Sequence, residues 1–309
     1  MRTFMTKRYP REIMATACIP WTEDFQFDEK LFRKQVSMLC DQKIKSIYLF
    51  GTAGEGYSVS NRQFMDIVRA FRAETKGREG VRPMVGVISL SPDEIVERIE
   101  AAAREGITDF QISFPAWGAV SDKEALTFLH YICDRFPDLS FMHYNNGLRS
   151  RKKLGGAAYA RIAEEIPNLV AVKHTGATLL EICDLQKREL PIQFFFLEDA
   201  YAYASLMGEA SLLISLCNIN YRLAFAYFEA GVNRDRETLM NMVQEFSTFY
   251  SLLSLLPGNL MDGAYDKLYL KYSIPEFPQR LYPPYEGATE QQFESFDKAL
   301  REAIPGWFL

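Results

Sequence analysis

Histidines, closely spaced cysteines and long apolar runs are scarce in this sequence. It has three histidines and five cysteines in 309 residues, and no two cysteines form a Cys-x-x-Cys pair. His130, His143 and His174 lack the spacing of a zinc site or an HExxH helix, so we expect no protein-bound catalytic metal. The odd number and wide spacing of the cysteines are typical of free thiols in a reducing compartment, which predicts a cytoplasmic protein.

Long hydrophobic stretches and an excess of basic charge are also absent. No uninterrupted run of about 18 apolar residues occurs, and none follows Arg2, Lys7 and Arg8 in residues 1–10. We therefore expect neither a signal peptide nor a membrane span. The 35 Lys and Arg residues against 40 Asp and Glu residues leave a net charge of −5. This balance offers no broad positive field, so neither nucleic acid nor a membrane is an expected partner.

The sequence does contain ample material for a large core, with 48% hydrophobic and 24% charged residues. Short apolar runs alternate with segments of helical period, which is typical of parallel βαβ units. Most of the runs are continuous rather than alternating, as strands buried on both faces are. The predicted strands are 14–21, 46–50, 84–88, 109–114, 140–144, 169–174, 193–197 and 212–217.

Helix signals occupy the gaps between these runs. Apolar residues recur at helical spacing in 32–40, 64–71 and 126–133. Three serines, each with a Glu or Gln three residues on, predict capped helix starts with a reciprocal side chain. These pairs are Ser60 with Gln63, Ser91 with Glu94, and Ser121 with Glu124, and the predicted helix ends are Gly77 and Gly106.

Eight successive strand–helix units predict an α/β protein with a closed (β/α)8 TIM barrel, and an open doubly wound sheet is the alternative. After about Asn233 the strand signal disappears, and 237–256 and 290–304 are predicted helices separated by a proline-rich stretch. We therefore expect a barrel at 1–233 that carries the active site, followed by a C-terminal helical domain at 234–309. Its Phe, Tyr and Leu residues suit packing on the barrel or on a second subunit.

In such barrels, reactive residues come from the carboxyl ends of strands and the loops that follow. The first candidate is Gly51-Thr52-Ala53-Gly54-Glu55-Gly56, whose glycines expose backbone N–H groups that can hold an anion. It matches neither a dinucleotide-binding motif nor a P-loop, and Glu55 opposes a phosphate. A small carboxylate bound by Thr52 and nearby amides is the favoured interpretation. The alternative is a glycine turn in which Glu55 is held for structural reasons.

The second candidate is Lys173, which closes the apolar run 169–174. Burial beside Val170 and Val172 disfavours the ammonium form, and this leaves a fraction as the neutral amine that Schiff-base chemistry needs. The alternative is a lysine paired with a carboxylate at the barrel mouth.

The third candidate is the end of the run 140–144 and the loop after it. Alternation predicts that His143 and Tyr144 point to opposite faces of the strand. Tyr144 would then reach Lys173 and move protons, while His143 would be a packed or hydrogen-bonded histidine. Arg149, in the following loop, either pairs with an anionic substrate group or forms a surface salt bridge.

Together these three segments resemble the N-acetylneuraminate lyase and dihydrodipicolinate synthase family of class I, pyruvate-type aldolases. Those enzymes carry a GTTGE or GSTGE loop after the second strand, a Tyr-Asn segment at the end of the fifth and the Schiff-base lysine at the end of the sixth. The matching pieces are Gly51 to Glu55, Tyr144-Asn145 and Lys173, in the same order and at similar spacing. The resemblance spans nearly the whole chain and implies a homotetramer built as a dimer of dimers.

The resemblance also implies roles for individual residues. Lys173 would form an imine with the 2-oxo carbon of pyruvate or another 2-keto acid, and Tyr144 would shuttle protons. Thr52 would bind the C1 carboxylate with the loop amides and pass protons to and from Tyr144. The imine is itself the electron sink, so neither a metal nor an organic cofactor is expected. The predicted substrate-binding residues are Thr52, Ala53, Trp117, Arg149 and Ile214.

The sequence also departs from the family pattern. Ala53 replaces the second hydroxyl residue of the loop, which removes a hydrogen bond to the carboxylate worth about 1 kcal/mol. Trp117 stands about where the synthases carry a tyrosine donated across a dimer interface, and an indole cannot relay a phenolic proton.

Two further segments differ. The segment after Tyr144 reads Asn-Asn-Gly-Leu-Arg rather than Asn-Val-Pro-Gly-Arg, and Leu197-Glu198-Asp199 replaces the usual Gly-Asp-Asp. These departures argue against a true dihydrodipicolinate synthase. Trp117 and Leu197 further predict a pocket less suited to a highly polar substrate tail than that of a sialic-acid lyase.

Three hypotheses follow. The leading one is a Schiff-base lyase that cleaves or forms a carbon–carbon bond between pyruvate and an aldehyde. The alternative is a dehydratase of 2-keto-3-deoxy sugar acids that uses the same lysine imine. The third is a non-catalytic barrel that binds a small ligand. Catalysis requires that Lys173, Tyr144 and Thr52 converge on one cavity.

Overall fold

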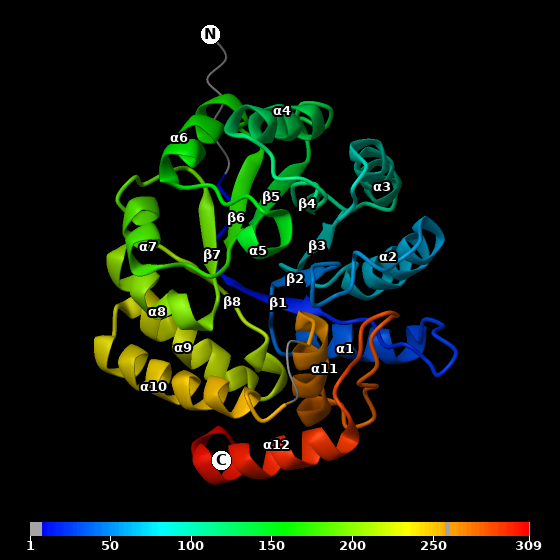
Figure 1. Cartoon of the computed structure of the whole chain (residues 1–309), viewed down its shortest axis with the longest axis vertical. Coiled ribbons are helices and arrows are strands. Elements are labelled where there is room, and N and C mark those ends of the chain that lie inside the picture. Colours follow the sequence, from blue (N-terminus) through cyan, green and yellow to red (C-terminus); the bar gives the residue numbers. More distant parts are fainter. Residues whose placement is uncertain (1–7, 257–259, 309) are drawn as a thin grey trace.

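The computed structural model describes residues 8–256 and 260–308 and contains a closed barrel of parallel strands in sequential order (Figure 1). Each strand pairs with the next, and β8 pairs with β1. The predicted (β/α)8 barrel is confirmed, and the open sheet is wrong. The strands are β1 (Ile13–Ala17), β2 (Ser46–Leu49), β3 (Arg82–Gly86), β4 (Asp109–Ile112), β5 (Ser140–Asn145), β6 (Leu169–His174), β7 (Gln193–Phe196) and β8 (Ser211–Leu213).

Helices surround the barrel, and further helices follow it in the C-terminal part of the chain (Figure 1). The first group is α1 (Glu29–Asp41), α2 (Asn61–Thr75), α3 (Pro92–Arg104), α4 (Asp122–Cys133), α5 (Gly147–Ser150), α6 (Gly156–Glu165), α7 (Leu179–Gln186), α8 (Glu198–Met207) and α9 (Tyr221–Asn233). The second group is α10 (Arg236–Leu253), α11 (Asp262–Ser273) and α12 (Glu290–Ala303), and the 3-10 turns are η1 (Leu216–Asn218) and η2 (Pro305–Phe308).

Capping chemistry explains where several helices begin and end. The predicted reciprocal caps at Ser60 and Ser121 are confirmed. At Ser91 only half of the prediction holds: its Oγ accepts the Glu94 N–H, but the Glu94 carboxylate binds Ser89 and Arg98 instead. Gly77 and Gly106 follow α2 and α3 with φ of 77° and 89°, as expected of glycine after a helix end.

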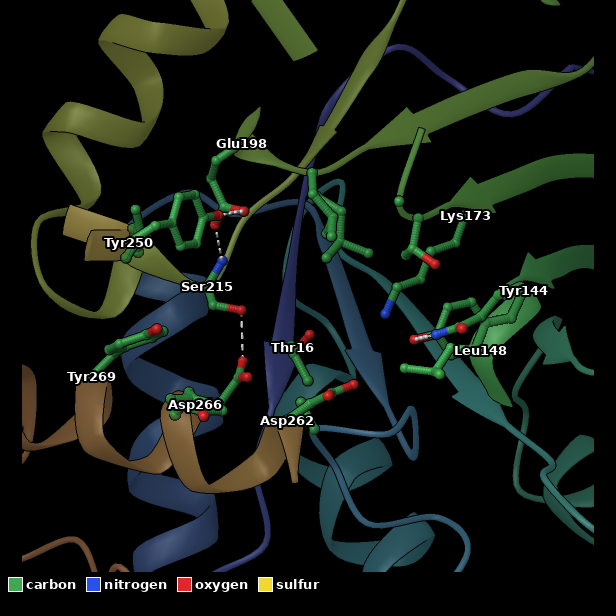
Figure 2. Close-up of a pocket in the computed structure, with 18 of the residues that line it drawn as sticks. Thr16, Tyr144, Leu148, Lys173, Glu198, Ser215, Tyr250, Asp262, Asp266 and Tyr269 are labelled. Atoms are coloured by element: carbon green, nitrogen blue, oxygen red, sulfur yellow. Dashed lines mark hydrogen bonds between the residues drawn. The ribbon is translucent and has the colours of Figure 1, made fainter. Parts of the chain in front are cut away.

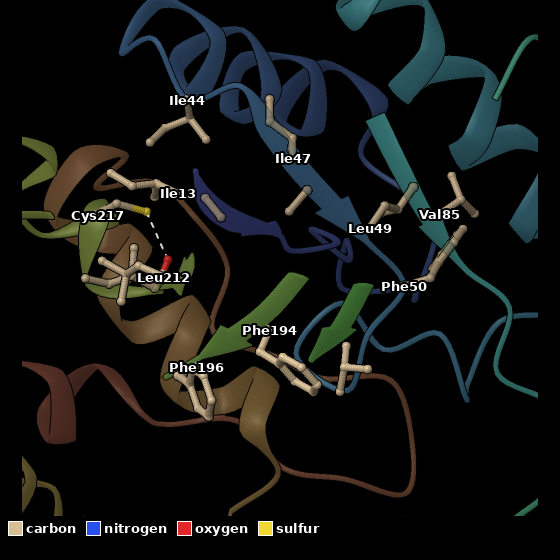
Figure 3. Packing of buried hydrophobic residues seen from close by; sticks show 14 of the residues in the cluster. Ile13, Ile44, Ile47, Leu49, Phe50, Val85, Phe194, Phe196, Leu212 and Cys217 are labelled. Carbon is tan, nitrogen blue, oxygen red and sulfur yellow. Dashed lines mark hydrogen bonds between the residues drawn. The ribbon is translucent and has the colours of Figure 1, made fainter. Parts of the chain in front are cut away.

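The strands separate two apolar layers, one between the strands and the helices and one inside the barrel. Outward-facing residues such as Ile47, Leu49 and Phe194 pack against the helices (Figure 3). Inward-facing residues such as Tyr48 and Phe195 form a second buried cluster that fills the barrel. The interior is therefore a packed core rather than a pore, so a ligand can be held only at the strand ends and the loops above them.

Helix α11 was not among the predicted helices. It contains Asp266 and Lys267, both buried, and these polar residues interrupt the apolar stripe that would have revealed it.

We keep as a proposal the division of the chain at residue 233, which ends α9. No helix within residues 8–256 and 260–308 has the length and apolarity needed to cross a membrane. The first seven residues, to which the signal-peptide expectation partly refers, lie outside the described residues.

Candidate active site

Lys173 lies at the end of β6 with its side chain inside the barrel mouth. The register pairs it with Tyr144 on β5 and Phe195 on β7, and its exposed fraction is 6%. Its Nζ lies 4.2 Å from the ring centroid of Tyr144 and 5.2 Å from that of Tyr48 (Figure 2 shows Lys173 and Tyr144). Within the described parts of the chain, no carboxylate forms a salt bridge with Lys173, which argues against the paired-lysine alternative.

Tyr144 links Lys173 to Thr52. The Thr52 Oγ1 lies 3.4 Å from the Tyr144 phenol oxygen and donates to it. Asn146 Nδ2 donates to the same oxygen at 2.9 Å. The phenol oxygen thus accepts two hydrogen bonds, which leaves its own proton free to turn toward a bound molecule. Asn146 was missed by the sequence reasoning, although Asn before Gly at a helix start is a recognisable cap signal, and Asn146 does cap α5.

His143 points away from the cavity, as alternation predicted. Its Nδ1 lies 2.8 Å from the hydroxyl of Tyr159 on α6, and the histidine is fully buried between the sheet and the helices. Burial, with a further contribution from the charge of His174, lowers the pKa of His143 to about 3. His143 is therefore neutral at ordinary pH, and it packs between β5 and α6 outside the barrel interior.

The turn after β2 is held by an ion pair that reaches across the molecule. Glu55, with φ of 53°, is fully buried, and its Oε1 accepts from Lys267 Nζ on α11 at 2.5 Å. Trp21 Nε1 and the backbone N–H of Tyr282 also donate to this carboxylate. The structural interpretation of Glu55 is thus the one the contacts support. Lys267 was missed because nothing in the sequence links it to a turn so far away along the chain.

Two cavities of about 630 Å³ each open at this end of the barrel, and Tyr144 lines both. The first is also lined by Lys173 and Ala53, and the second by Thr52 and Arg149. The expected convergence of Lys173, Tyr144 and Thr52 on one cavity is only partly met, because Thr52 lines the second cavity and Lys173 the first, and Tyr144 connects them. We call these three residues the strand wall.

Across the first cavity lies a group of polar residues that we call the far wall: Glu198, Ser215, Tyr250 and Asp266 (Figure 2). Ser215 Oγ donates to Asp266 Oδ1 at 2.6 Å, and the Ser215 N–H donates to Glu198 Oε1 at 3.0 Å. Tyr250 donates to Glu198 Oε2 at 3.3 Å. Burial raises the pKa of both carboxyl groups, that of Asp266 to about 7.

Three predicted binding residues lie elsewhere than expected. Trp117 is 85% exposed and lines neither cavity, because its loop projects into solvent, where the Trp117 carbonyl accepts from Arg151. Ile214 points into the core between sheet and helices, while Leu213 and Ser215 on either side of it line the first cavity. Arg149 lines the second cavity but already pairs with Asp262 at 3.0 Å.

Only one of the two residues behind the expected character of the pocket lies in it. Leu197 does line the first cavity, but Trp117 does not. The hydroxyl and carboxyl groups of the far wall supply the polar partners that the sequence alone did not indicate. That this pocket suits a highly polar tail less well than the pocket of a sialic-acid lyase stays a prediction.

Comparison with known proteins agrees with the resemblance drawn from the motifs. The family model described as "Dihydrodipicolinate synthetase family" matches residues 9–245. The chain is 25% identical over 257 residues to a "Probable 5-dehydro-4-deoxyglucarate dehydratase" of Bradyrhizobium sp. strain BTAi1, covering 80% of this chain and 74% of the relative. It is 24% identical over 310 residues to human N-acetylneuraminate lyase, covering 96% and 93%.

A solved structure shares the fold. The Escherichia coli K12 prophage protein YagE, of the dihydrodipicolinic acid synthase family and in complex with pyruvate, superposes with a TM-score of 0.84. The alignment covers 95% of this chain and 98% of YagE at 15% sequence identity. The predicted family is confirmed.

Proposed function

This chain belongs to the dihydrodipicolinate synthetase family and is a lyase, and we propose that it forms a Schiff base between Lys173 and a 2-keto acid. The observation that carries the proposal is the position of Lys173 Nζ, buried at the barrel mouth and 4.2 Å from the ring centroid of Tyr144. A buried amine beside a phenol has both the nucleophile and the proton carrier that imine formation requires.

The proposed reaction is the cleavage or formation of a carbon–carbon bond next to a pyruvate unit. The lysine amine adds to the keto carbon and water leaves, which gives a protonated imine. The electron pair of the C3–C4 bond then moves into the imine as the 4-hydroxyl loses its proton through the Tyr144 oxygen and the aldehyde departs. Protonation of the resulting enamine at C3 and hydrolysis release pyruvate and return the lysine amine.

The strand wall supports this sequence of proton transfers. Thr52 and Asn146 both donate to the Tyr144 oxygen, so they hold the phenol in place and stabilise negative charge that develops on it. The backbone N–H groups of the turn after β2 are proposed to hold the C1 carboxylate beside Ala53. The protonated imine supplies the electron sink, so the proposed reaction requires neither metal nor organic cofactor.

Dehydration of a 2-keto-3-deoxy sugar acid through the same imine is the second candidate. The similarity to relatives named as dehydratases favours it. In that reaction the imine loses a proton from C3 to form an enamine, whose electrons expel the 4-hydroxyl, which takes up a proton and leaves as water; the C3–C4 bond stays intact. The two reactions share the lysine step and differ in the bond that breaks afterwards. The non-catalytic hypothesis is set aside, because the chain is a lyase of this family.

Assembly and location are also proposals. We propose a homotetramer, supported by large apolar side chains that remain exposed, among them Trp117 and Leu148 at 85% and 81%. Light scattering on the purified protein tests it, and a monomeric mass would contradict it. A cytoplasmic location is supported by the five cysteines, all of which are unpaired.

The test of the lysine chemistry is reductive trapping. The protein is incubated with pyruvate and sodium borohydride, its intact mass is measured, and the modified peptide is mapped. An adduct on Lys173, absent from Lys173→Ala and retained by the exposed-lysine control Lys123→Ala, supports the proposal. No adduct with pyruvate or with longer 2-keto acids would contradict it.

A further inference from the structure

We propose, resting on the function proposed above, that the far wall binds the hydroxyl groups of an uncharged substrate tail and that Asp266 selects against a tail ending in a second carboxylate. The strand wall holds the keto-acid end of the molecule. A sugar acid attached to Lys173 must then extend across the cavity toward the opposite side, where Ser215 and Asp266 lie (Figure 2).

Asp266 can accept a hydrogen bond from a ligand in the first cavity. It is only 6% exposed, and its Oδ1 accepts from Ser215. Its Oδ2 has no hydrogen-bond partner among residues 8–256 and 260–308. Asp266 lines the first cavity, so this open carboxylate oxygen can accept a hydrogen bond from a hydroxyl group of a bound molecule.

The charges around the cavity disfavour a second carboxylate. Three acidic side chains line it: Asp262, which pairs with Arg149, and Glu198 and Asp266, which form no salt bridge within residues 8–256 and 260–308. The lysines that line it are Lys173, which the imine consumes, and Lys153, which already pairs with Glu181 at 2.9 Å. A tail carboxylate beside Asp266 would face like charge without a free cation in the described wall, and such juxtapositions are costly.

This selection distinguishes the chain from some of its relatives. The substrate in the name of the Bradyrhizobium relative, 5-dehydro-4-deoxyglucarate, carries a carboxylate at each end. The far wall of this chain fits instead the analogue with a terminal hydroxymethyl group, 2-keto-3-deoxygluconate. The two acids have the same length and differ mainly in the charge of the tail, so they isolate the proposed effect.

The experiment is a competition for Lys173. Isotopically labelled pyruvate is trapped with borohydride at pH 8, above the pKa of about 7 for Asp266, while each acid is added in turn. The readout is the concentration of acid that halves the labelled adduct within the first turnover, before pyruvate released from the acid can itself compete. For the wild-type protein we expect 2-keto-3-deoxygluconate to compete at least about tenfold better than 5-dehydro-4-deoxyglucarate.

Variants test whether Asp266 causes the difference. Asp266→Asn should reduce the preference by about tenfold, Asp266→Glu should restore much of it, and the exposed control Asp138→Asn should leave it unchanged. Pyruvate has no tail, so all folded variants should still trap it.

The outcomes separate the two proposals. No labelled adduct in the wild-type protein overturns the proposed function. A normal adduct with equal or better competition by the dicarboxylate overturns the role of Asp266 alone, even if Asp266→Asn does not fold. A preference that survives unchanged in a folded Asp266→Asn protein also overturns it.

Discussion

The strand wall and the far wall combine different elements of the chain. The strand wall comes from the ends of β2, β5 and β6, whose positions follow from the barrel itself. The far wall joins two barrel elements, α8 and the segment after β8, to α10 and α11. Glu198 and Ser215 already meet within the barrel, whereas Tyr250 and Asp266 reach them because the C-terminal helices pack over it. The difference teaches that the proposed chemistry belongs to the barrel, whereas the proposed selection by Asp266 depends on how the C-terminal helices pack over it.

The largest expected effect comes from removing the nucleophile of the strand wall, which tests whether that wall carries the chemistry. Lys173→Ala should lower kcat/KM by about 10⁴-fold or more, because no other group can form the imine. Steady-state kinetics and borohydride trapping measure the loss. The exposed Lys123→Ala serves as the matched control. Substantial activity in Lys173→Ala would show that the strand wall does not carry the chemistry.

The second prediction asks whether the helical part holds the strand wall in place. Lys267→Met leaves Glu55 as an uncompensated buried charge, and we expect the free energy of unfolding to fall by about 3–5 kcal/mol. Urea denaturation measures the change. Lys271→Met on the same helix removes a pair with an exposed carboxylate, Glu290, and should cost at most about 1 kcal/mol.

The double variant completes this test. Neutralising both partners, in Glu55→Gln with Lys267→Met, should recover part of the lost stability, because no unpaired charge remains. Equal losses from Lys267→Met and Lys271→Met would mean that the buried pair does not connect the two parts of the molecule.

The third prediction concerns proton transfer within the strand wall. Tyr144→Phe removes the hydroxyl that contacts Thr52 and Asn146, and kcat should fall by about 10²-fold or more. Borohydride trapping of pyruvate should persist, because Lys173 remains. The half-buried Tyr131 on α4 lines neither cavity, so Tyr131→Phe is the control for the loss of a tyrosine hydroxyl. An unchanged kcat for Tyr144→Phe would remove Tyr144 from the proposed relay.

The last prediction concerns the pH dependence of stability and involves two histidines behind the strand wall. Burial lowers the pKa of His143 to about 3 and that of His174 to about 4, whereas both lie near 6.5 in an unfolded chain. The unfolded chain therefore takes up protons first on acidification. Stability should be full above about pH 6.5 and should fall between pH 6.5 and 4, by about 1.4 kcal/mol per pH unit for each histidine.

Urea denaturation at pH 7, 6 and 5 measures this slope. His143→Gln should make it shallower by about half, since one of the two titrating groups is gone. Stability that rises toward pH 5 would contradict the assignment of neutral, buried histidines.

The sequence-based analysis was most successful where local signals suffice. Continuous apolar runs identified all eight strands, although 14–21 and 212–217 extend past the ends of β1 and β8, since apolar residues also continue into buried loops. Alternation correctly placed His143 and Tyr144 on opposite faces of β5. It could not place Trp117, because a loop residue has no periodicity that shows whether it faces a cavity or solvent.

By itself, the sequence determined the barrel, its eight-strand order, the family and the strand-end positions of Lys173 and Tyr144. These follow from periodicity and strand alternation, which are properties of neighbouring residues. Only the tertiary structure brought Asp266 to Ser215 and Lys267 to Glu55. Contacts between residues far apart in the chain depend on how α11 packs over the barrel mouth. That packing results from the burial of many side chains at once and leaves no repeating pattern in the sequence.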